Sequence, residues 1–262
     1  MSGELDIGVI ASFSGAICLY VLMPVAAVAW ARRRLDVGWK VVGMGALAFA
    51  LSQLLTRVPA VQVAQYFLRD TLKASVLATH VWLVVLSLTA GLFEETARLL
   101  AFKYPLKGYR RWKDAVGFGL GHGGLESALL VGGLGVLGLI NVVVLTQLDL
   151  STLNLPPEQI EQLRAGKEQV AALQWWEPLL GVYERIGALL LHVALSVLVL
   201  QRFLRGQRRW YWLAVGFHAL TNELASLAAR DLGKVAAEGV MTIAALVSLW
   251  IILRLRDRRM PA

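Results

Sequence analysis

The chain has 262 residues, of which 57% are hydrophobic and 17% are charged. This composition excludes a soluble domain with a fully solvated surface and favours an integral membrane protein. The formal net charge of +8 does not indicate a nucleic-acid partner, because the basic residues form short clusters at the ends of apolar runs, as membrane topology requires.

Apolar segments long enough to cross a hydrocarbon core of ~30 Å follow one another along the chain. In chain order, we expect spans over residues 7–31, 40–56, 75–102, 114–146, 179–201, 211–229 and 234–254. The fourth segment is long for one span and short for two, so both possibilities stay open there. The predicted fold class is all-α, a polytopic transmembrane helical bundle of about seven to eight spans, in a single integral-membrane domain over residues 1–262.

Two further helices are expected outside these spans. One is a surface helix over residues 58–72. The other is an amphipathic helix that begins at Pro156 or Pro157, within an external loop over residues 147–178. The first apolar segment lacks the basic start of a signal peptide, so we expect it to be retained in the membrane.

Basic residues gather mainly in alternate connections between the expected spans. The four richest clusters lie at residues 32–40, 103–113, 202–209 and 254–259. The positive-inside rule assigns these clusters to the cytoplasmic face, with the N-terminus outside and the C-terminus inside. We expect the protein in the lipid bilayer of a prokaryotic plasma membrane.

Ionisable side chains on four different expected spans lie at a common depth. Each is nine or ten residues from the nearest basic cluster: Glu94, His122, His192 and His218. In helices this spacing corresponds to roughly 13–15 Å from the same membrane face. Intramembrane ionisable residues are functional candidates by default, and a shared site explains their alignment most economically. His80 has no polar companion expected at its depth, and we interpret it as structural or interfacial.

Helical spacing adds further polar residues to these positions. Glu126 shares a helix face with His122, and Asn222 shares one with His218, because residues four apart point the same way. Simpler interpretations stay open at this point. The acids near Arg98 also fit an intrahelical salt bridge near the interface, and each histidine also fits a hydrogen bond between packed helices.

Three short motifs resemble those of a superfamily of intramembrane peptidases. "EETAR" (94–98), "FGLGH" (118–122) and "HALTN" (218–222) are similar to the EExxxR, FxxxH and HxxxN/D motifs of the CAAX-protease and bacteriocin-processing superfamily (type II CAAX, PrsW-like). Within it, "GHGGLES" (121–127) and "YERIGALLLH" (183–192) look most like the YhfC group, described as intramembrane metalloproteases.

The resemblance implies catalytic roles for residues at matching positions. In the CAAX-type enzymes the first glutamate activates water with the motif histidine, and the final histidine and asparagine form an oxyanion hole. The catalytic set implied for this chain is Glu94 as base, Glu95, Arg98, His122 as partner of the base, and His218 with Asn222 as oxyanion donors. Only two residues separate Glu95 from Arg98 where the CAAX-type pattern has three, so Arg98 need not share that geometry.

A zinc site is the second implication. Three of four residues would supply the ligands, with Glu94 as the base: His122, Glu126, His192 and His218. Histidines on three spans fit an open tetrahedral zinc site. We favour zinc because His192 otherwise has no role in the CAAX-type scheme.

The sequence therefore predicts an intramembrane peptidase with a catalytic core over about residues 75–229. It would hydrolyse a peptide bond of a membrane-embedded or lipidated peptide by glutamate-activated, zinc-bound water. A metal-independent glutamate-type protease of the CAAX kind is the first alternative. A transporter or proton relay, or an inactive scaffold protein, is the non-enzymatic alternative, because such proteins also place acids and histidines within the membrane.

Overall fold

The fold was obtained as a computed structural model that describes residues 6–256. The described residues form helices and connecting turns, with no strand among them, as the all-α prediction requires. Arg258 and Arg259 of the predicted last basic cluster lie outside the described residues. The chain divides into two compact units. Unit 1 runs up to Met23 and includes Ser127–Arg185, and unit 2 comprises Pro24–Glu126 and the chain from Ile186 onward.

Six helical segments in the described part are long and apolar enough to cross a membrane. They are Ile7–Leu35 (α1), Trp39–Ala74 (α2, η1 and α3), Val76–Lys103 (α4), Trp112–Gln147 (α5, η2 and α6), Glu177–Leu204 (α8) and Lys234–Arg254 (α10). These segments confirm a polytopic helical membrane protein. Helix α9 (Arg209–Asp231) is not among the six, since His218, Asn222 and Glu223 make its middle polar. The count of seven to eight spans, the orientation and the single domain stay predictions.

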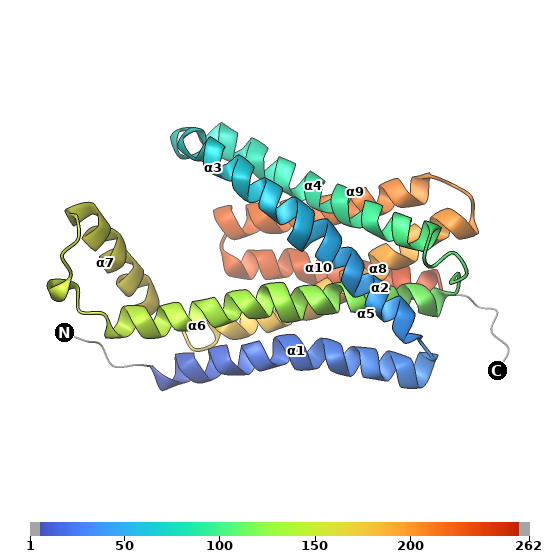
Figure 1. Cartoon of the computed structure of the whole chain (residues 1–262), viewed down its shortest axis with the longest axis horizontal. Helices are drawn as coiled ribbons and strands as arrows, with labels where there is room; N and C mark the ends of the chain where they lie inside the picture. Colours follow the sequence, from blue (N-terminus) through green and yellow to red (C-terminus); the bar gives the residue numbers. More distant parts are fainter. Residues whose placement is uncertain (1–5, 257–262) are drawn as a thin grey trace. The chain divides into compact units, whose positions relative to one another are not determined.

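The second expected span and the expected surface helix form one continuous helical segment. Helix α2 (Trp39–Phe49) passes into the π-helix η1 (Ala50–Arg57) and then into α3 (Val58–Ala74), which Figure 1 shows as a single rod. The expected helix over residues 58–72 is thus present as α3, but it continues directly from η1 and does not stand apart from the second span. Pro59 lies in the first turn of α3, where proline is tolerated because its missing N–H is not needed there.

The long fourth segment is also one continuous helical segment. It consists of α5 (Trp112–Leu125), the π-helix η2 (Glu126–Val131) and α6 (Gly132–Gln147). At its start, the Asp114 carboxylate accepts a hydrogen bond from the Arg111 backbone N–H at 2.9 Å. An acid in the first turn also suits the positive end of the helix dipole.

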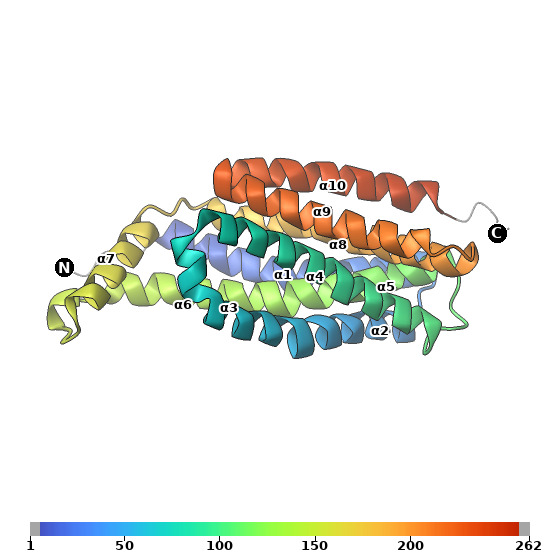
Figure 2. The ribbon, with the colours of Figure 1, turned by 90° about the horizontal axis from the view of Figure 1, so that it is seen from above.

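Close approach of helices through small residues holds unit 2 together. Helix α9 lies between α4 and α10 (Figure 2), in contact with both. A methyl group at Gly91 of α4 would lie 2.8 Å from the Val215 carbonyl oxygen of α9, and one at Gly119 of α5 would lie 2.7 Å from the His192 carbonyl oxygen of α8. Small residues at such contacts are typical of membrane helix packing. They bring the polar side chains of α4, α5, α8 and α9 within reach of one another.

Unit 1 contains the predicted amphipathic helix. Helix α7 (Pro157–Ala171) begins at Pro157, as predicted, because proline suits the first helical position. Lys167 of α7 donates to the Leu148 carbonyl oxygen at 2.6 Å, just after the end of α6. Within the same unit, the Ser127 hydroxyl donates to the Tyr20 carbonyl oxygen at 3.0 Å. The external location of this loop stays a prediction.

An ion pair fixes the turn between α1 and α2 in unit 2. Asp36 adopts a positive φ of 52°, and the Lys113 ammonium donates to its carboxylate at 2.7 Å. This hydrogen bond, with the charge of Lys113, holds the pKa of the exposed Asp36 carboxyl below its ordinary value. The pair joins one expected cytoplasmic connection to the start of α5.

Candidate active site

Four helices of unit 2 each contribute buried ionisable side chains to one cluster. Helix α4 contributes Glu94, Glu95 and Arg98, while α5, α8 and α9 contribute the histidines. Arg98 and Glu95 are 0% exposed, and so is His122 of α5. The expected convergence of these side chains is thus present in the structure, while their common depth in the membrane stays a prediction. Their catalytic roles stay predictions.

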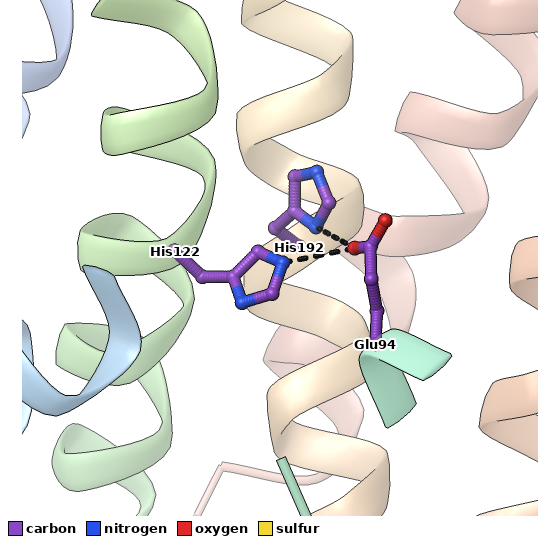
Figure 3. Close-up of side chains that lie close together, drawn as sticks. All are labelled: Glu94, His122 and His192. Atoms are coloured by element: carbon purple, nitrogen blue, oxygen red, sulfur yellow. Dashed lines mark hydrogen bonds and ion pairs between the residues drawn. The ribbon is translucent and has the colours of Figure 1, made fainter. Parts of the chain in front are cut away.

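Glu94 stands at the centre of one half of the cluster. Its Oε2 atom lies 2.9 Å from His122 Nε2 and 3.9 Å from His192 Nδ1 (Figure 3). Arg98 Nη2 lies 3.6 Å from the same oxygen. One carboxylate oxygen therefore faces two imidazoles and one guanidinium.

The donor atoms of this half suit a metal ion. One ligand atom each from Glu94, His122 and His192 lies within 4.8 Å of the other two, and all three residues are buried. Imidazole nitrogen and carboxylate oxygen are common zinc ligands, and three protein ligands leave a coordination position open for water or substrate. The donor set fits a catalytic metal.

Hydrogen bonds define the tautomer of His192. Arg98 Nη2 lies 2.7 Å from His192 Nδ1, and because a guanidinium only donates, Nδ1 is the acceptor. The proton is then on Nε2, which donates to Glu126 Oε2 at 2.5 Å. A histidine that binds a metal through one nitrogen and donates from the other to a carboxylate is a recurrent arrangement. Nδ1 has one lone pair, so a metal held at this nitrogen would take the place of the Arg98 hydrogen bond.

Glu95 organises the other half of the cluster. Arg98 Nη1 donates to Glu95 Oε1 at 3.2 Å, and His218 Nδ1 lies 2.9 Å from the same oxygen. Because the paired carboxylate accepts, Nδ1 of a neutral His218 carries the proton and Nε2 carries the lone pair. That Nε2 atom lies 3.9 Å from Glu94 Oε1. The two halves meet at the Glu94 carboxylate.

Two carboxylates of the cluster lie next to one guanidinium. Glu94 and Glu95 both pair with Arg98, at 3.6 Å and 3.2 Å. Buried charges need paired partners in a region of low dielectric constant. A cation bound at Glu94 would add a second positive partner for these carboxylates.

His122 differs from the other two clustered histidines. Its Nδ1 atom is buried and has no hydrogen-bond partner within residues 6–256. The rings of Phe49 and Phe118 lie beside it, with centroid distances of 5.4 Å and 6.3 Å. The Glu94 carboxylate and aromatic packing together orient His122. His192 and His218 instead each have polar partners at both ring nitrogens.

The structure distributes the predicted ligands differently from the sequence interpretation. Glu94, expected as the base, is in the metal-type group with His122 and His192. Glu126 instead accepts a hydrogen bond from His192 Nε2, and His218 Nδ1 bonds to Glu95. Asn222, one turn beyond His218 on α9, is partly buried and makes no side-chain hydrogen bond to the described residues. Its role as an oxyanion donor stays a prediction.

Two residues of the cluster's surroundings were missed from the sequence. Gln53 of η1 is 3% exposed and donates from Nε2 to Glu94 Oε1 at 2.7 Å. Arg57, at the end of the same π-helix, donates to Gln53 Oε1 at 3.0 Å. The available signal was a polar glutamine one helical turn before an arginine in an otherwise apolar segment.

His80 lies near the start of α4, away from the cluster in sequence. The expectation that it lacks a polar companion is wrong, since Arg230 Nη2 of α9 forms a short contact with its Nε2 atom. Its Nδ1 atom also lies 2.7 Å from the Val76 carbonyl oxygen. Arg230 in turn donates to Asp231 at 2.7 Å. His80 thus belongs to an exposed group at one end of the α4 and α9 pair.

Comparison with known proteins gives one family and one close relative. Residues 19–245 match the family described as YhfC intramembrane metalloprotease. The chain is 30% identical over 246 residues to a Bacillus subtilis (strain 168) protein named "Uncharacterized membrane protein YhfC", covering 92% of this chain and 93% of that protein. No solved structure gives a significant match.

Proposed function

From the premise that this chain belongs to the YhfC family, we propose that it is an intramembrane metallopeptidase with Glu94, His122 and His192 as its metal ligands. The observation that carries the proposal is the buried group of these three side chains, with their ligand atoms within 4.8 Å of one another. The family description, intramembrane metalloprotease, supports the same chemistry. Zinc is the proposed ion, since two imidazoles and one carboxylate form a known catalytic zinc set.

A metal at this position supplies a specific kind of chemistry. When bound by two histidines and a glutamate, zinc lowers the pKa of a bound water to about 7 and polarises a carbonyl oxygen. Glu126 holds the Nε2 proton of His192 and so keeps Nδ1 available as a ligand. The aromatic rings around His122 keep its Nε2 atom turned toward Glu94.

His218 and Glu95 are proposed to move the proton. Glu95 accepts from His218 Nδ1, so the Nε2 lone pair faces the Glu94 side of the site, where it can accept a proton from the attacking water. Protonated His218 then donates from Nε2 to the leaving amine. Arg98 donates to Glu95 Oε1 at 3.2 Å and so holds this carboxylate in place beside His218. In this proposal His218 is a proton carrier, whereas the superfamily resemblance implied an oxyanion donor, and Asn222 retains that donor role.

The proposed substrate is a membrane-embedded or lipidated peptide, in a prokaryotic plasma membrane. Glu94, His122 and His192 lie on helices that are long and apolar enough to cross a bilayer, so a scissile bond must be reached from within the membrane. The place of the chain in the wider CAAX-type superfamily is part of the same proposal, supported by the motifs around Glu94, His122 and His218.

Cleavage by the purified protein in liposomes tests this function. A panel of single-span and lipidated reporter peptides is incubated with wild type, Glu94→Gln, His192→Ala and the matched control His80→Ala, and fragments are identified by mass spectrometry. We expect cleavage by wild type and His80→Ala, and a loss of at least about 10²-fold in the other two variants.

Other outcomes would contradict the proposal in distinct ways. Cleavage that survives complete removal of metal would indicate a metal-independent glutamate-type protease. Solute or proton flux with no cleavage of any reporter would indicate a transporter. Equal activity in wild type and Glu94→Gln would exclude this cluster as the site of the reaction.

A further inference from the structure

Gln53 of the π-helix η1 makes a buried hydrogen bond to the proposed metal ligand Glu94. We infer that Gln53, itself fixed by Arg57, is a positioning residue that sets the orientation of the Glu94 carboxylate. The inference rests on the proposed function, because it assigns a task to residues around a proposed ligand. It concerns residues that neither the motifs nor the metal-type group include.

The two oxygens of Glu94 have separate partners. Oε1 accepts from Gln53 Nε2 at 2.7 Å, the shortest contact that this carboxylate makes. Oε2 faces His122 Nε2 at 2.9 Å and Arg98 Nη2 at 3.6 Å. Gln53 therefore occupies Oε1, which also lies 3.9 Å from His218 Nε2, and leaves Oε2 turned toward the imidazoles of His122 and His192.

Arg57 determines which way the Gln53 amide points. Its Nη1 atom donates to Gln53 Oε1 at 3.0 Å, and a guanidinium has no acceptor. The amide oxygen must therefore face Arg57, which turns the amide nitrogen toward Glu94. Arg57 is itself held by α4, since it donates to the Thr89 hydroxyl at 3.2 Å and to the Leu86 carbonyl oxygen at 2.5 Å.

The π winding of η1 places Gln53 in this chain of hydrogen bonds. A π-helix shifts the register of side chains relative to an α-helix, and such windings are frequent at functional sites. The Thr56 hydroxyl donates to the Leu51 and Ser52 carbonyl oxygens, each at 2.8 Å, within the same winding. Glu126, which bonds to His192, begins the second π-helix, η2. Two of the three proposed ligands are thus each supported by a residue from a π-helix.

The consequence concerns how Glu94 binds a cation. With Oε1 held by Gln53, the carboxylate offers Oε2 alone, as a ligand through one oxygen. Loss of the amide donor releases Oε1, so the carboxylate can rotate or bind through both oxygens. Residues that orient a ligand in this way typically contribute 10–100-fold to metal affinity.

Metal affinity and a Co²⁺ spectrum test the inference on the full chain in detergent. Zn²⁺ affinity is measured by competition with a chromophoric chelator, and the visible absorption of bound Co²⁺ reports its coordination. Gln53→Met removes the donor at similar volume, and Ser52→Ala is the matched control, because within residues 6–256 the Ser52 hydroxyl donates only to the Phe49 carbonyl oxygen. We expect about 10–100-fold weaker Zn²⁺ binding and an altered Co²⁺ spectrum in Gln53→Met, with Ser52→Ala like wild type.

A second pair of variants keeps the test decisive if Gln53→Met folds poorly. Arg57→Met frees the amide to flip and should weaken binding in the same direction, while Arg57→Lys retains one donor to Gln53 and should restore part of the affinity. Unchanged affinity and spectrum in both Gln53→Met and Arg57→Met, with metal binding still lost in Glu94→Gln, would overturn this inference alone. Absence of stoichiometric metal binding in wild type would instead overturn the proposed function.

Discussion

Helices α4 and α9 meet through ionisable side chains at two levels, and the two groups are built differently. At one level Glu95 bonds to His218, and α5 and α8 add further imidazoles, so the His218 side chain is only 4% exposed. At the other level His80 bonds to Arg230, whose side chain is 31% exposed. Both groups pair a histidine of this helix pair with charged partners. Burial by two additional helices, and not the residue types, distinguishes a candidate reaction site from an ionic group at the helix ends.

The two groups should differ most in how much stability the protein loses when the arginine of each group is replaced. Arg98→Met leaves two buried carboxylates without their guanidinium, which should destabilise the protein by roughly 3–5 kcal/mol. Arg230→Met breaks only a partly exposed pair and should cost far less stability than Arg98→Met. Denaturation of both variants in the same detergent measures the comparison, and equal losses of stability would show that the cluster is not electrostatically coupled.

The next largest effect is the loss of metal affinity expected when Glu126, the carboxylate that accepts from His192, is replaced. Glu126→Gln removes the anionic acceptor of the His192 Nε2 proton, so metal affinity should fall about 10–100-fold. Asp231→Asn changes the carboxylate of the exposed group and serves as the matched control. Competition titration measures the Zn²⁺ affinity of Glu126→Gln and of Asp231→Asn. The same affinity in both variants would contradict the proposal that Glu126 orients His192.

A smaller effect, which depends on pH, is expected at the exposed pair of Asp36 and Lys113. The pKa of Asp36 is lowered chiefly by the hydrogen bond from Lys113. A carboxyl with a lowered folded pKa stabilises the protein above its ordinary pKa, and this stabilisation is lost as the pH falls through the folded pKa. The difference in melting temperature between wild type and Asp36→Asn should therefore be small at neutral pH and shrink in acid. A difference that grows as the pH falls would contradict this assignment.

The smallest loss of stability is expected at His80, which is half-buried. His80→Ala should change the free energy of unfolding by less than about 0.5 kcal/mol, as for surface substitutions in general. Cleavage and metal content should equal those of wild type. A loss of activity in this variant would show that the two levels of the α4 and α9 pair are coupled.

Much of this comparison could be predicted from the sequence. The apolar runs indicated the helices, and the spacing from basic clusters indicated that Glu94, His122, His192 and His218 lie at one depth. Both signals are local, because a helix converts residue number directly into distance along its axis. The motif resemblance pointed to the same residues.

What the sequence missed depends on contacts between helices. Glu126 was assigned to the face of His122, four residues away, but its partner is His192 on another helix. Gln53 was missed because a neutral amide among apolar residues gives no charge signal, and because the π-helix that orients it has no clear signature in sequence. The pairing of His80 with Arg230 likewise joins residues far apart in the chain.

Metal content of purified protein tests the central claim most directly. Wild type, His122→Ala, His192→Ala and His80→Ala are purified side by side without chelator, and bound metal is measured by elemental analysis. The account predicts about one equivalent of a divalent metal, zinc foremost, in wild type and His80→Ala, and loss of that metal in the other two variants. No metal in wild type, or the same content in all four proteins, would contradict it.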